Sequence, residues 1–484
     1  MAFNNTEIQP MSYFRLEEHS NVILAHVFVM IITWVFLLPA VVMLSIAQSW
    51  LRTPLQATFF SLNLFGVLLG VTYNRQTPNL YENEKHGLLG WVSTFLAAVW
   101  LACGLVLSYL RLKRRIQAED PIYSPSSDVS QSPLLSDELA GSSFEYRDIG
   151  PSDEDMDAAN SICKARDLSP RTKYSLRSSQ SIKSLLVVTV AINDWLILLL
   201  GFSCVTTGAA VYGGMFQGHN IFTGLAHFIK GGIFVFCGLL TFGRWLGSFA
   251  KLGWAWNKKP HNKSTRLWLS SVPSAEFVEC LLICLYGASN IWLEHLNNLG
   301  GDWSTADIQH VSITVKFFGG GLLGMLIESR IVPKVTTTPR PKSDRYELPM
   351  NPMPAIVIYL LGSIMGEHHQ ASTVIAMLHK RWGELFMGAA IARIATYCIL
   401  YLKPPSDDSP QRPFTEIVTS LCLVSGGIVL MISNKDTGKM LEGSSIDAII
   451  VFNIAVGTTA ILMAWTAVCL AIKDAAKRRG SRVC

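Results

Sequence analysis

Residues 354–402 read PAIVIYLLGSIMGEHHQASTVIAMLHKRWGELFMGAAIARIATYCILYL, with two apolar strings on either side of a polar centre. Both strings are apolar enough to lie in lipid, whereas the centre contains Glu367, His368, His369 and His379. Removing carboxylate and imidazole groups from water is costly, so their presence in a membrane segment indicates a functional site. The stretch therefore predicts a membrane-embedded helical fold with a polar site inside it.

The composition supports the same class of fold along the whole chain. Of the 484 residues, 50% are apolar and only 15% are charged, and the mean hydropathy is +0.33. The apolar residues form blocks long enough to cross a bilayer, which soluble domains rarely contain. The net charge of +5 comes from basic residues beside those blocks, so it indicates orientation in a lipid bilayer and no binding to nucleic acid.

Stretches of about 20 apolar residues give eleven expected membrane spans, three early and eight late. The early spans cover about 22–46, 56–73 and 87–110. The late spans cover about 184–212, 221–243, 271–294, 308–329, 354–378, 385–402, 414–433 and 448–472. We therefore expect an all-α, polytopic helical membrane protein of about 11 transmembrane helices, with an N-terminal domain at 1–112 and a C-terminal domain at 184–484.

The segment between the two groups, residues 113–183, is rich in Ser, Pro, Asp and Glu. Such a composition cannot bury enough apolar surface to fold, so we expect a disordered cytoplasmic linker. Ser-Pro dipeptides, which suit proline-directed kinases, begin at Ser124, Ser132 and Ser169. A kinase contact at the linker is therefore an expected partner interaction.

Basic residues predict the orientation of the spans, because Lys and Arg concentrate on the cytoplasmic side. Clusters after the third, fifth and seventh spans and at the C-terminus fall on one side, while Lys380-Arg381 breaks the rule. The C-terminus is then cytoplasmic and the N-terminus lumenal or extracellular. With 354–378 as one span, residues 367–369 lie in the outer half of the bilayer, and His379 caps the span at the outer surface.

Most of the other histidines also fall at the outer ends of spans, several with a carboxylate one turn away. Neutral imidazoles beside Asp or Glu are ligands that a transition metal prefers. The candidate metal ligands are His227, Glu294, His295, Asp307, His310, Glu367, His368, His369 and His379. The alternative is that each His only forms a hydrogen bond to a neighbouring helix.

A second group of charged residues lies near the cytoplasmic ends of the spans, with opposite charges at similar depth. This arrangement favours ion pairs that hold the bundle together. The residues are Arg244, Glu276, Glu279, Glu328, Arg393 and Glu416. Deeper in the membrane Asp194 needs a partner of opposite charge, and we expect Lys230 or Lys316 to supply it.

Several strings resemble the Ytp-like family of fungal membrane proteins. The early ones are HVFVMIITWVFLLPA (26–40), LQATFFSLNLFGVLLG (55–70) and KHGLLGW (85–91). The later ones include AHFIKGGIFVFCGLLTFGRWLG (226–247), GWAWN (253–257), EFVE (276–279), EHHQ (367–370), HKRWG (379–383) and RPFTE (412–416). The resemblance implies a membrane-embedded protein and brings no established activity.

The first domain is also similar to the ascorbate-dependent transmembrane cytochromes b, in which each haem is held by His from helices two apart. This resemblance matches His26 on the first span and His86 on the third to one haem-binding pair. The middle span, 56–73, contains no His and departs from the family pattern. The resemblance therefore implies a single haem b, or the same fold without haem.

Three functions are compatible with these patterns. The first is a haem- or metal-associated redox protein that transfers electrons. The second is a transition-metal or proton-coupled transporter, and the third is a non-catalytic membrane scaffold. The sequence contains no nucleophile elbow, HExxH motif, P-loop or dinucleotide fingerprint, which argues against soluble-enzyme chemistry.

Overall fold

The computed structural model describes residues 12–119, 170–217, 221–259, 272–294, 301–303, 305–329, 350–365 and 372–483. The described residues form helices and no β-strands. Nine helices within these ranges are long and apolar enough to cross a membrane. The prediction of a polytopic helical membrane protein is therefore confirmed.

The N-terminal bundle begins with one continuous helical rod formed by α1 (Ser20–Ile31), the π-type segment η2 (Ile32–Leu37) and α2 (Leu38–Ile46). Pro39 follows the wide π turn, as expected because proline has no N–H and its ring clashes with the preceding helical turn. The other helices of this bundle are α3 (Arg52–Gln76), α4 (His86–Glu119) and α6 (Pro170–Gly213).

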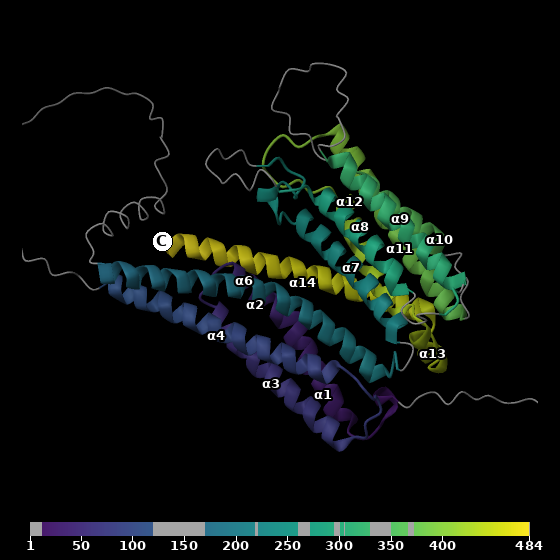
Figure 1. Ribbon diagram of the computed structural model, residues 1–484, viewed down its shortest axis with the longest axis horizontal. Coiled ribbons are helices and arrows are strands. Elements are labelled where there is room, and N and C mark those ends of the chain that lie inside the picture. Colours follow the sequence, from purple (N-terminus) through teal and green to yellow (C-terminus); the bar gives the residue numbers. More distant parts are fainter. Residues whose placement is uncertain are drawn as a thin grey trace, which may run out of the picture.

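Helix α6 begins the second group of spans in the sequence, yet it packs on α4 in the N-terminal bundle (Figure 1). Val190 and Ile197 of α6 share one buried apolar core with Trp34, Phe59 and Trp100. The N-terminal bundle is therefore built from four membrane-spanning segments, because the chain returns to it after residues 120–169.

The packing of α6 on α4 determines which side chains contact Asp194 of α6. Its carboxylate accepts hydrogen bonds from Trp100 Nε1 at 2.8 Å and from Ser45 Oγ at 3.0 Å. The predicted pairing of Asp194 with Lys230 or Lys316 is wrong, because α6 turns this side chain toward α2 and α4. Lys230 lies on α7, and Lys316 is half-buried on α9.

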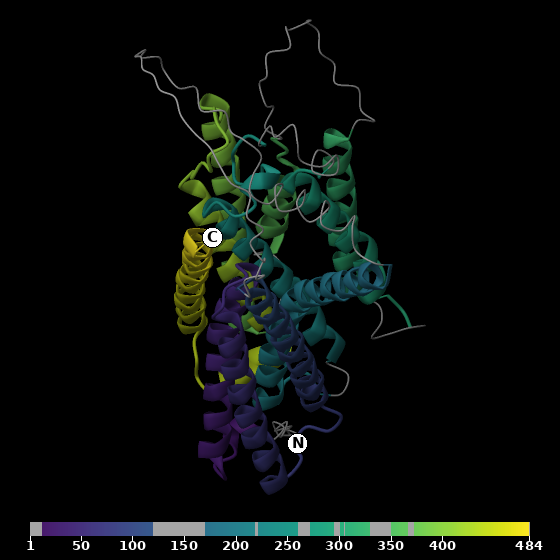
Figure 2. The same cartoon turned by 90° about the vertical axis from the view of Figure 1, so that its left-hand side faces the viewer.

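The C-terminal bundle consists of α7 (Ile221–Trp245), α8 (Ala275–Glu294), α9 (Thr305–Glu328), α10 (Met353–Met365), α11 (Thr373–Leu402) and α12 (Thr415–Ile432). Its core includes Leu378, Phe386 and Val429. The short α13 (Lys435–Gly443) leads into the last helix, α14 (Ala448–Val483), which packs on both α2 and α12. Figures 1 and 2 both show α14 running beside the two bundles, which it joins.

The stretch 354–402 differs from its predicted form. Helix α10 ends at Met365, and α11 begins at Thr373 after Ser372, whose Oγ accepts a hydrogen bond from the Ile375 N–H. The expectation of one span over 354–378 is therefore wrong, because an N-capping serine starts a new helix there. His379 lies buried inside α11 and does not cap a span at the surface.

Helix α11 also explains why Lys380-Arg381 departs from the rule that basic residues lie on the cytoplasmic side. Lys380 and Arg381 lie within α11 but are exposed on its outside, and Arg381 forms an ion pair with Glu384 at 2.8 Å. An exposed pair needs no buried partner, so α11 can continue through this sequence.

The predicted linker, 113–183, is helical at both ends, because α4 continues to Glu119 and α6 begins at Pro170. Disorder is therefore wrong for these two ends. The middle of the linker, with Ser124, Ser132 and Ser169, lies outside the described residues.

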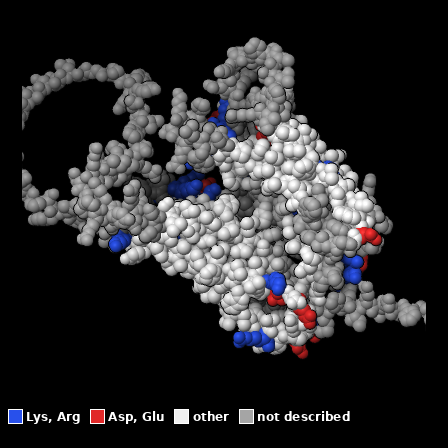
Figure 3. Space-filling view, viewed as in Figure 1, with Lys and Arg blue, Asp and Glu red and all other residues white. Residues whose placement is uncertain are grey.

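The exposed surface of the helices fits a lipid environment. Figure 3 shows a broad uncharged area over both bundles, with the charged residues gathered toward its edges. Large apolar side chains such as Phe28, Phe95 and Ile454 are mostly exposed on their helices. A surface of this kind is stable in lipid and would aggregate in water.

Candidate functional site

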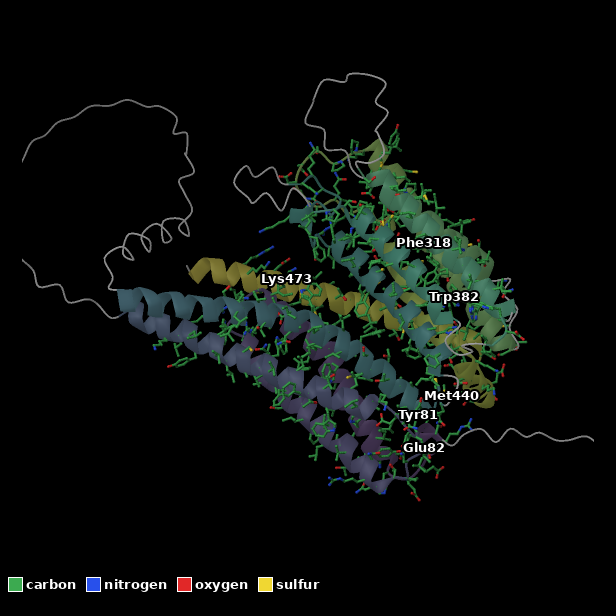
Figure 4. The ribbon with its side chains drawn as sticks, viewed as in Figure 1. Tyr81, Glu82, Phe318, Trp382, Met440 and Lys473 are labelled. Carbon is green, nitrogen blue, oxygen red and sulfur yellow. The ribbon has the colours of Figure 1, made fainter. Side chains whose placement is uncertain are left out.

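A cavity of about 460 Å³ lies inside the C-terminal bundle and is lined by α7 to α12. Its wall is largely apolar and includes Phe234 of α7, Phe317 of α9 and Trp382 of α11. Figure 4 labels Trp382 within this bundle. An apolar pocket of this size with a few polar groups is typical of a site for a small molecule.

One part of the cavity, which we name the histidine end, is defined by His227, His310 and His379. The ring centroids of His227 and His379 are 6.3 Å apart, and the rings are nearly perpendicular. Nδ1 of His379 lies 3.0 Å from the carbonyl oxygen of Ile375. Because a carbonyl only accepts, Nδ1 carries a proton in this contact. Other polar residues that line the cavity here are Lys230, Asn290, Gln309, Asn434 and Lys435.

The other part, which we name the arginine end, is a buried network of five charged residues. Arg244 on α7 donates to Glu276 at 2.8 Å and to Glu279 at 3.1 Å, both on α8. Arg393 on α11 contacts Glu279 at 3.3 Å and Glu416 on α12 at 2.9 Å. Glu279 and Arg393 also line the cavity. The network therefore joins four helices and forms part of the cavity wall.

An aromatic side chain covers the two guanidinium groups. The carbon of the Arg244 guanidinium lies 4.4 Å from the ring centroid of Trp256, and that of Arg393 lies 5.5 Å away. Trp256 is buried in the loop after α7, and Asn257 holds this loop by donating to carbonyl oxygens of Ala250 and Asp408. Cation–π contact adds to the ion pairs here.

Five of the six residues predicted to form ion pairs are thus brought together, and one is not. Glu328, at the end of α9, accepts hydrogen bonds from Asn351 Nδ2 at 2.8 Å and from Ser274 Oγ. Its expected role in an ion pair is not seen among the described residues, because these neutral donors occupy its carboxylate.

Only some of the predicted metal ligands have side chains among the described residues. His227, His310 and His379 line one cavity. His295, Glu367, His368 and His369 lie outside the described residues, as do the side chains of Glu294 and Asp307. Within the described ranges, no group of three or more His, Cys, Asp or Glu side chains is placed to hold a metal ion.

The N-terminal bundle contains a second pair of histidines. The ring centroids of His26 on α1 and His86 on α4 are 6.5 Å apart. Nδ1 of His26 lies 2.8 Å from the Gly66 carbonyl oxygen, and Nδ1 of His86 lies 3.1 Å from Thr207 Oγ1. Thr207 donates its own proton to Ser203 O at 2.7 Å, so it accepts from His86. Both rings therefore carry their proton on Nδ1 and leave Nε2 as the basic nitrogen.

The positions of Trp256 and Cys237 at the site could not be predicted from the sequence. Trp256 lies in a loop, with φ at 55°, and nothing in its local sequence indicates which charges it covers. Cys237 lies on α7 two turns before Arg244 and lines the cavity, but in the sequence it is one of several cysteines in apolar spans. In both cases the packing of distant helices creates the role.

These features define a class of protein, a polytopic helical membrane protein with an internal cavity bounded by ionisable side chains. Comparison with known protein families identifies the family within this class. Residues 200–474 match the family described as Protein YTP1-like, C-terminal, and residues 7–110 match a domain of unknown function, DUF2427. The chain therefore belongs to the Ytp1-like family, and its N-terminal match gives no support to the resemblance with cytochromes b.

Similar proteins occur in two yeasts. An uncharacterized membrane protein of Schizosaccharomyces pombe is 34% identical over 99% of both chains. An uncharacterized membrane protein of Saccharomyces cerevisiae is 37% identical over 55% of this chain and 45% of its own length. Protein YTP1 of Saccharomyces cerevisiae is 23% identical over 35% of this chain and 33% of its own. No solved structure gives a significant match.

Proposed function

We propose that this chain is a membrane transporter whose C-terminal bundle binds a small amphipathic molecule. The observation that carries this proposal is the cavity of about 460 Å³ with an apolar middle and ionisable side chains at both ends. A structural bundle gains most by filling such a space, because interior packing contributes directly to stability. Ionisable residues around a cavity at membrane depth are typical of solute and ion pathways.

The arrangement of the polar groups supports an amphipathic ligand. The apolar wall would cover the body of the molecule, while its polar groups would contact the histidine end or the arginine end. A purely apolar ligand would leave the ionisable side chains without a role, and a free ion would leave the apolar wall without one.

The test uses Cys237, which lines the cavity. A variant that keeps only this cysteine is reconstituted in vesicles and treated with a charged, membrane-impermeant thiol reagent from either side. We expect Cys237 to be modified from at least one side, and Ala390→Trp, which fills the cavity, to slow this modification at least tenfold. A second variant that keeps only Cys280, a buried cysteine outside the cavity, is the control. An unreactive Cys237 in folded protein would contradict the proposal.

A second candidate is a one-electron redox protein with haem b held by His26 and His86. His26 and His86 would hold the haem iron, because their ring centroids are 6.5 Å apart, a separation at which two imidazoles could share one metal ion. Their Nδ1–H groups are oriented by Gly66 and Thr207, the arrangement found behind metal-ligating histidines. When bound, haem would supply one-electron transfer.

The haem candidate is tested by the absorption spectrum of the purified protein. We expect a Soret band and a reduced b-type α band that disappear in His26→Ala and in His86→Ala, with His19→Ala as the matched control. A colourless protein that is correctly folded would exclude this candidate.

A transition metal bound by the histidines predicted as ligands is the remaining option. It is tested by metal content measured by mass spectrometry for the wild type, for His379→Ala and for His368→Ala/His369→Ala. Equal, negligible metal in all three would remove it.

A further inference from the structure

The six helices around the cavity form a ring in which one junction differs from the others. Helices α7, α12, α11, α10, α9 and α8 all line the cavity, and in this order each helix packs on the next. The ring would close between α8 and α7. Over the described residues of these two helices, packing like that at the other five junctions is absent. The cavity wall therefore lacks one helix–helix contact.

Glycine residues show the same difference between the junctions. A Cβ atom added at Gly231 of α7 would lie 2.5 Å from the carbonyl oxygen of Gly427 on α12, and one added at Gly321 of α9 would lie 2.5 Å from the backbone nitrogen of Cys284 on α8. Equally close approaches occur between α12 and α11, α11 and α10, and α10 and α9, at Gly426, Gly362 and Gly320. None of the glycines of α7 or α8 has its nearest neighbours on the other of these two helices. Close approach through small residues, which packs helices in membranes, therefore does not join α7 to α8.

Ion pairs hold α7 and α8 together at the arginine end of the cavity. Arg244 is in the last turn of α7 and contacts Glu276, in the first turn of α8, and Glu279. Because the helices do not pack closely beyond this end, a space remains between them. We name this space the lateral slot and define it by Ile233 of α7 and Leu282 of α8.

The cavity reaches the surface of the bundle at the lateral slot. Ile233 and Leu282 both line the cavity, and they are 39% and 46% exposed. Phe317 and Trp382 line the same cavity but are only 5% and 3% exposed, so a position in the cavity wall does not by itself expose a side chain. Ile233 lies near the middle of the membrane span Gly224–Trp245. The slot therefore faces the hydrocarbon of the bilayer and not water.

We propose that the lateral slot is the entrance through which the cavity receives its ligand from the bilayer, and that this ligand is a single-chain amphiphile dissolved in the membrane. The inference names the ligand class and the route for the transport proposed above, and it rests on that proposal for the binding of a ligand. An apolar chain that passes between α7 and α8 moves from lipid into the apolar middle of the cavity. Its polar group then contacts the histidine end or the arginine end.

The chemistry of the slot favours this ligand over a water-soluble solute. Lipid chains are as apolar as the side chains of Ile233 and Leu282, so a chain can pass between them without losing favourable contacts. A polar solute would first have to leave water for the hydrocarbon, which is unfavourable without a hydrogen-bonding partner. The cavity volume of about 460 Å³ lies in the lower part of the range for small-molecule sites, roughly 300–1,000 Å³. This volume favours one chain over the two chains of a phospholipid.

The experiment measures how fast a thiol reagent dissolved in the bilayer reaches Cys237 inside the cavity. The chain that keeps only this cysteine is reconstituted in vesicles and treated with N-dodecylmaleimide. We expect modification that is slowed at least tenfold in Ile233→Trp/Leu282→Trp, because the larger side chains narrow the slot. The rate with the charged, membrane-impermeant reagent should change less than twofold. Leu323→Trp/Ile391→Trp, at exposed positions of α9 and α11 that do not line the cavity, is the matched control and should leave both rates unchanged.

Equal rates of modification by N-dodecylmaleimide in the slot variant and in the control variant would overturn the proposal. Equal slowing of both reagents would overturn it as well, because the tryptophans would then fill the cavity and not the slot. If Ile233→Trp/Leu282→Trp does not fold, Ile233→Phe/Leu282→Phe is measured against the same criteria.

The two proposals fail separately in this experiment. If the charged reagent modifies Cys237 and the rate with N-dodecylmaleimide does not depend on the slot, the transporter remains and the lateral entrance is removed. If tryptophan in the slot slows N-dodecylmaleimide while the charged reagent never modifies Cys237, the lateral entrance remains and the transporter is contradicted.

Discussion

Arg393 joins two carboxylates of the arginine end. It pairs with Glu279 and Glu416 and donates to Thr241 Oγ1 at 3.2 Å. The side chain of Glu416 is 0% exposed, so water cannot replace a lost partner. Arg393→Met should therefore lower the free energy of unfolding by about 3–5 kcal/mol, the usual cost of an uncompensated buried charge. Unfolding in detergent, by heat or denaturant, measures this change.

The matched control is Arg381→Met on the same helix, since Arg381 forms an exposed pair with Glu384. Exposed pairs contribute about 0–1 kcal/mol, so this variant should stay close to wild type. The double variant Arg393→Met/Glu416→Met should recover much of the loss, because apolar residues often replace a buried pair without penalty. Equal loss in the single and the double variant would show that the ion pair is not the cause.

For single residues, the sequence predicts the approximate depth of each charged side chain in the membrane. It predicts little about which charged side chains contact each other. Arg244, Glu276, Glu279, Arg393 and Glu416 meet because helix ends at one depth approach each other in a bundle. The partners of Asp194 could not be predicted in the same way. They depend on which helix α6 packs against, and that choice is made by apolar surfaces such as those of Val190 and Ile197.

Helices α7 and α12 cross where both backbones carry glycine. A Cβ atom added at Gly427 would lie 2.6 Å from the carbonyl oxygen of Gly231, closer than real contacts allow. Close approach of helices through small residues is typical of membrane bundles. We expect Gly427→Ala to destabilise the fold by about 1–3 kcal/mol, as overpacking does, measured by unfolding in detergent.

Gly319 on α9 and Gly457 on α14 are the controls for this substitution. A Cβ atom at either position would meet nothing within 4 Å. Alanine there should leave stability within about 1 kcal/mol of wild type, because it also improves helix propensity. Equal effects at Gly427 and Gly319 would mean that helix propensity, and not the crossing of α7 and α12, decides the result.

The elements themselves are well predicted by apolar length, but their ends and breaks are less so. The break between α10 and α11 falls where the sequence places the centre of a span, because the serine cap at Ser372 is a single-residue signal in a short polar sequence between two apolar strings. The helical ends of the predicted linker were missed for the converse reason. Charged and polar residues at 113–119 continue α4 beyond its apolar part, and those at 170–183 begin α6 before its apolar part.

Among the described residues, the two bundles are joined at several places that are distant in sequence. Trp465 of α14 donates from Nε1 to the carbonyl oxygen of Phe36 at 3.1 Å. At another place, the loop before α4 meets the chain between α6 and α7, where Tyr81 donates to the carbonyl oxygens of Met215 and Phe216. The Phe216 N–H in turn donates to Asp436 of α13. Figure 4 labels Tyr81 and Met440 near each other at this junction.

The junction gives a prediction with a defined dependence on pH. Tyr81 lies outside the membrane-spanning helices, and burial, followed by the charges of Asp436 and Glu84, raises its pKa above the ordinary value of 10.0. Because the folded chain then holds this proton more tightly than the unfolded chain, the contribution of Tyr81 to stability is complete below about pH 10 and is lost as pH rises above it.

Tyr81→Phe removes the donor and leaves two carbonyl oxygens with one partner fewer. We expect it to cost about 1 kcal/mol at pH 8, measured by thermal unfolding in detergent. The difference between wild type and Tyr81→Phe should shrink as pH rises past 10, because the wild type then loses the proton it donates. Tyr401→Phe, an exposed tyrosine, corrects for other alkaline titrations. A difference that stays constant to pH 11 would contradict this dependence on pH, whereas no difference at pH 8 would mean that Tyr81 stabilises the junction by packing alone, without a hydrogen bond from its hydroxyl group.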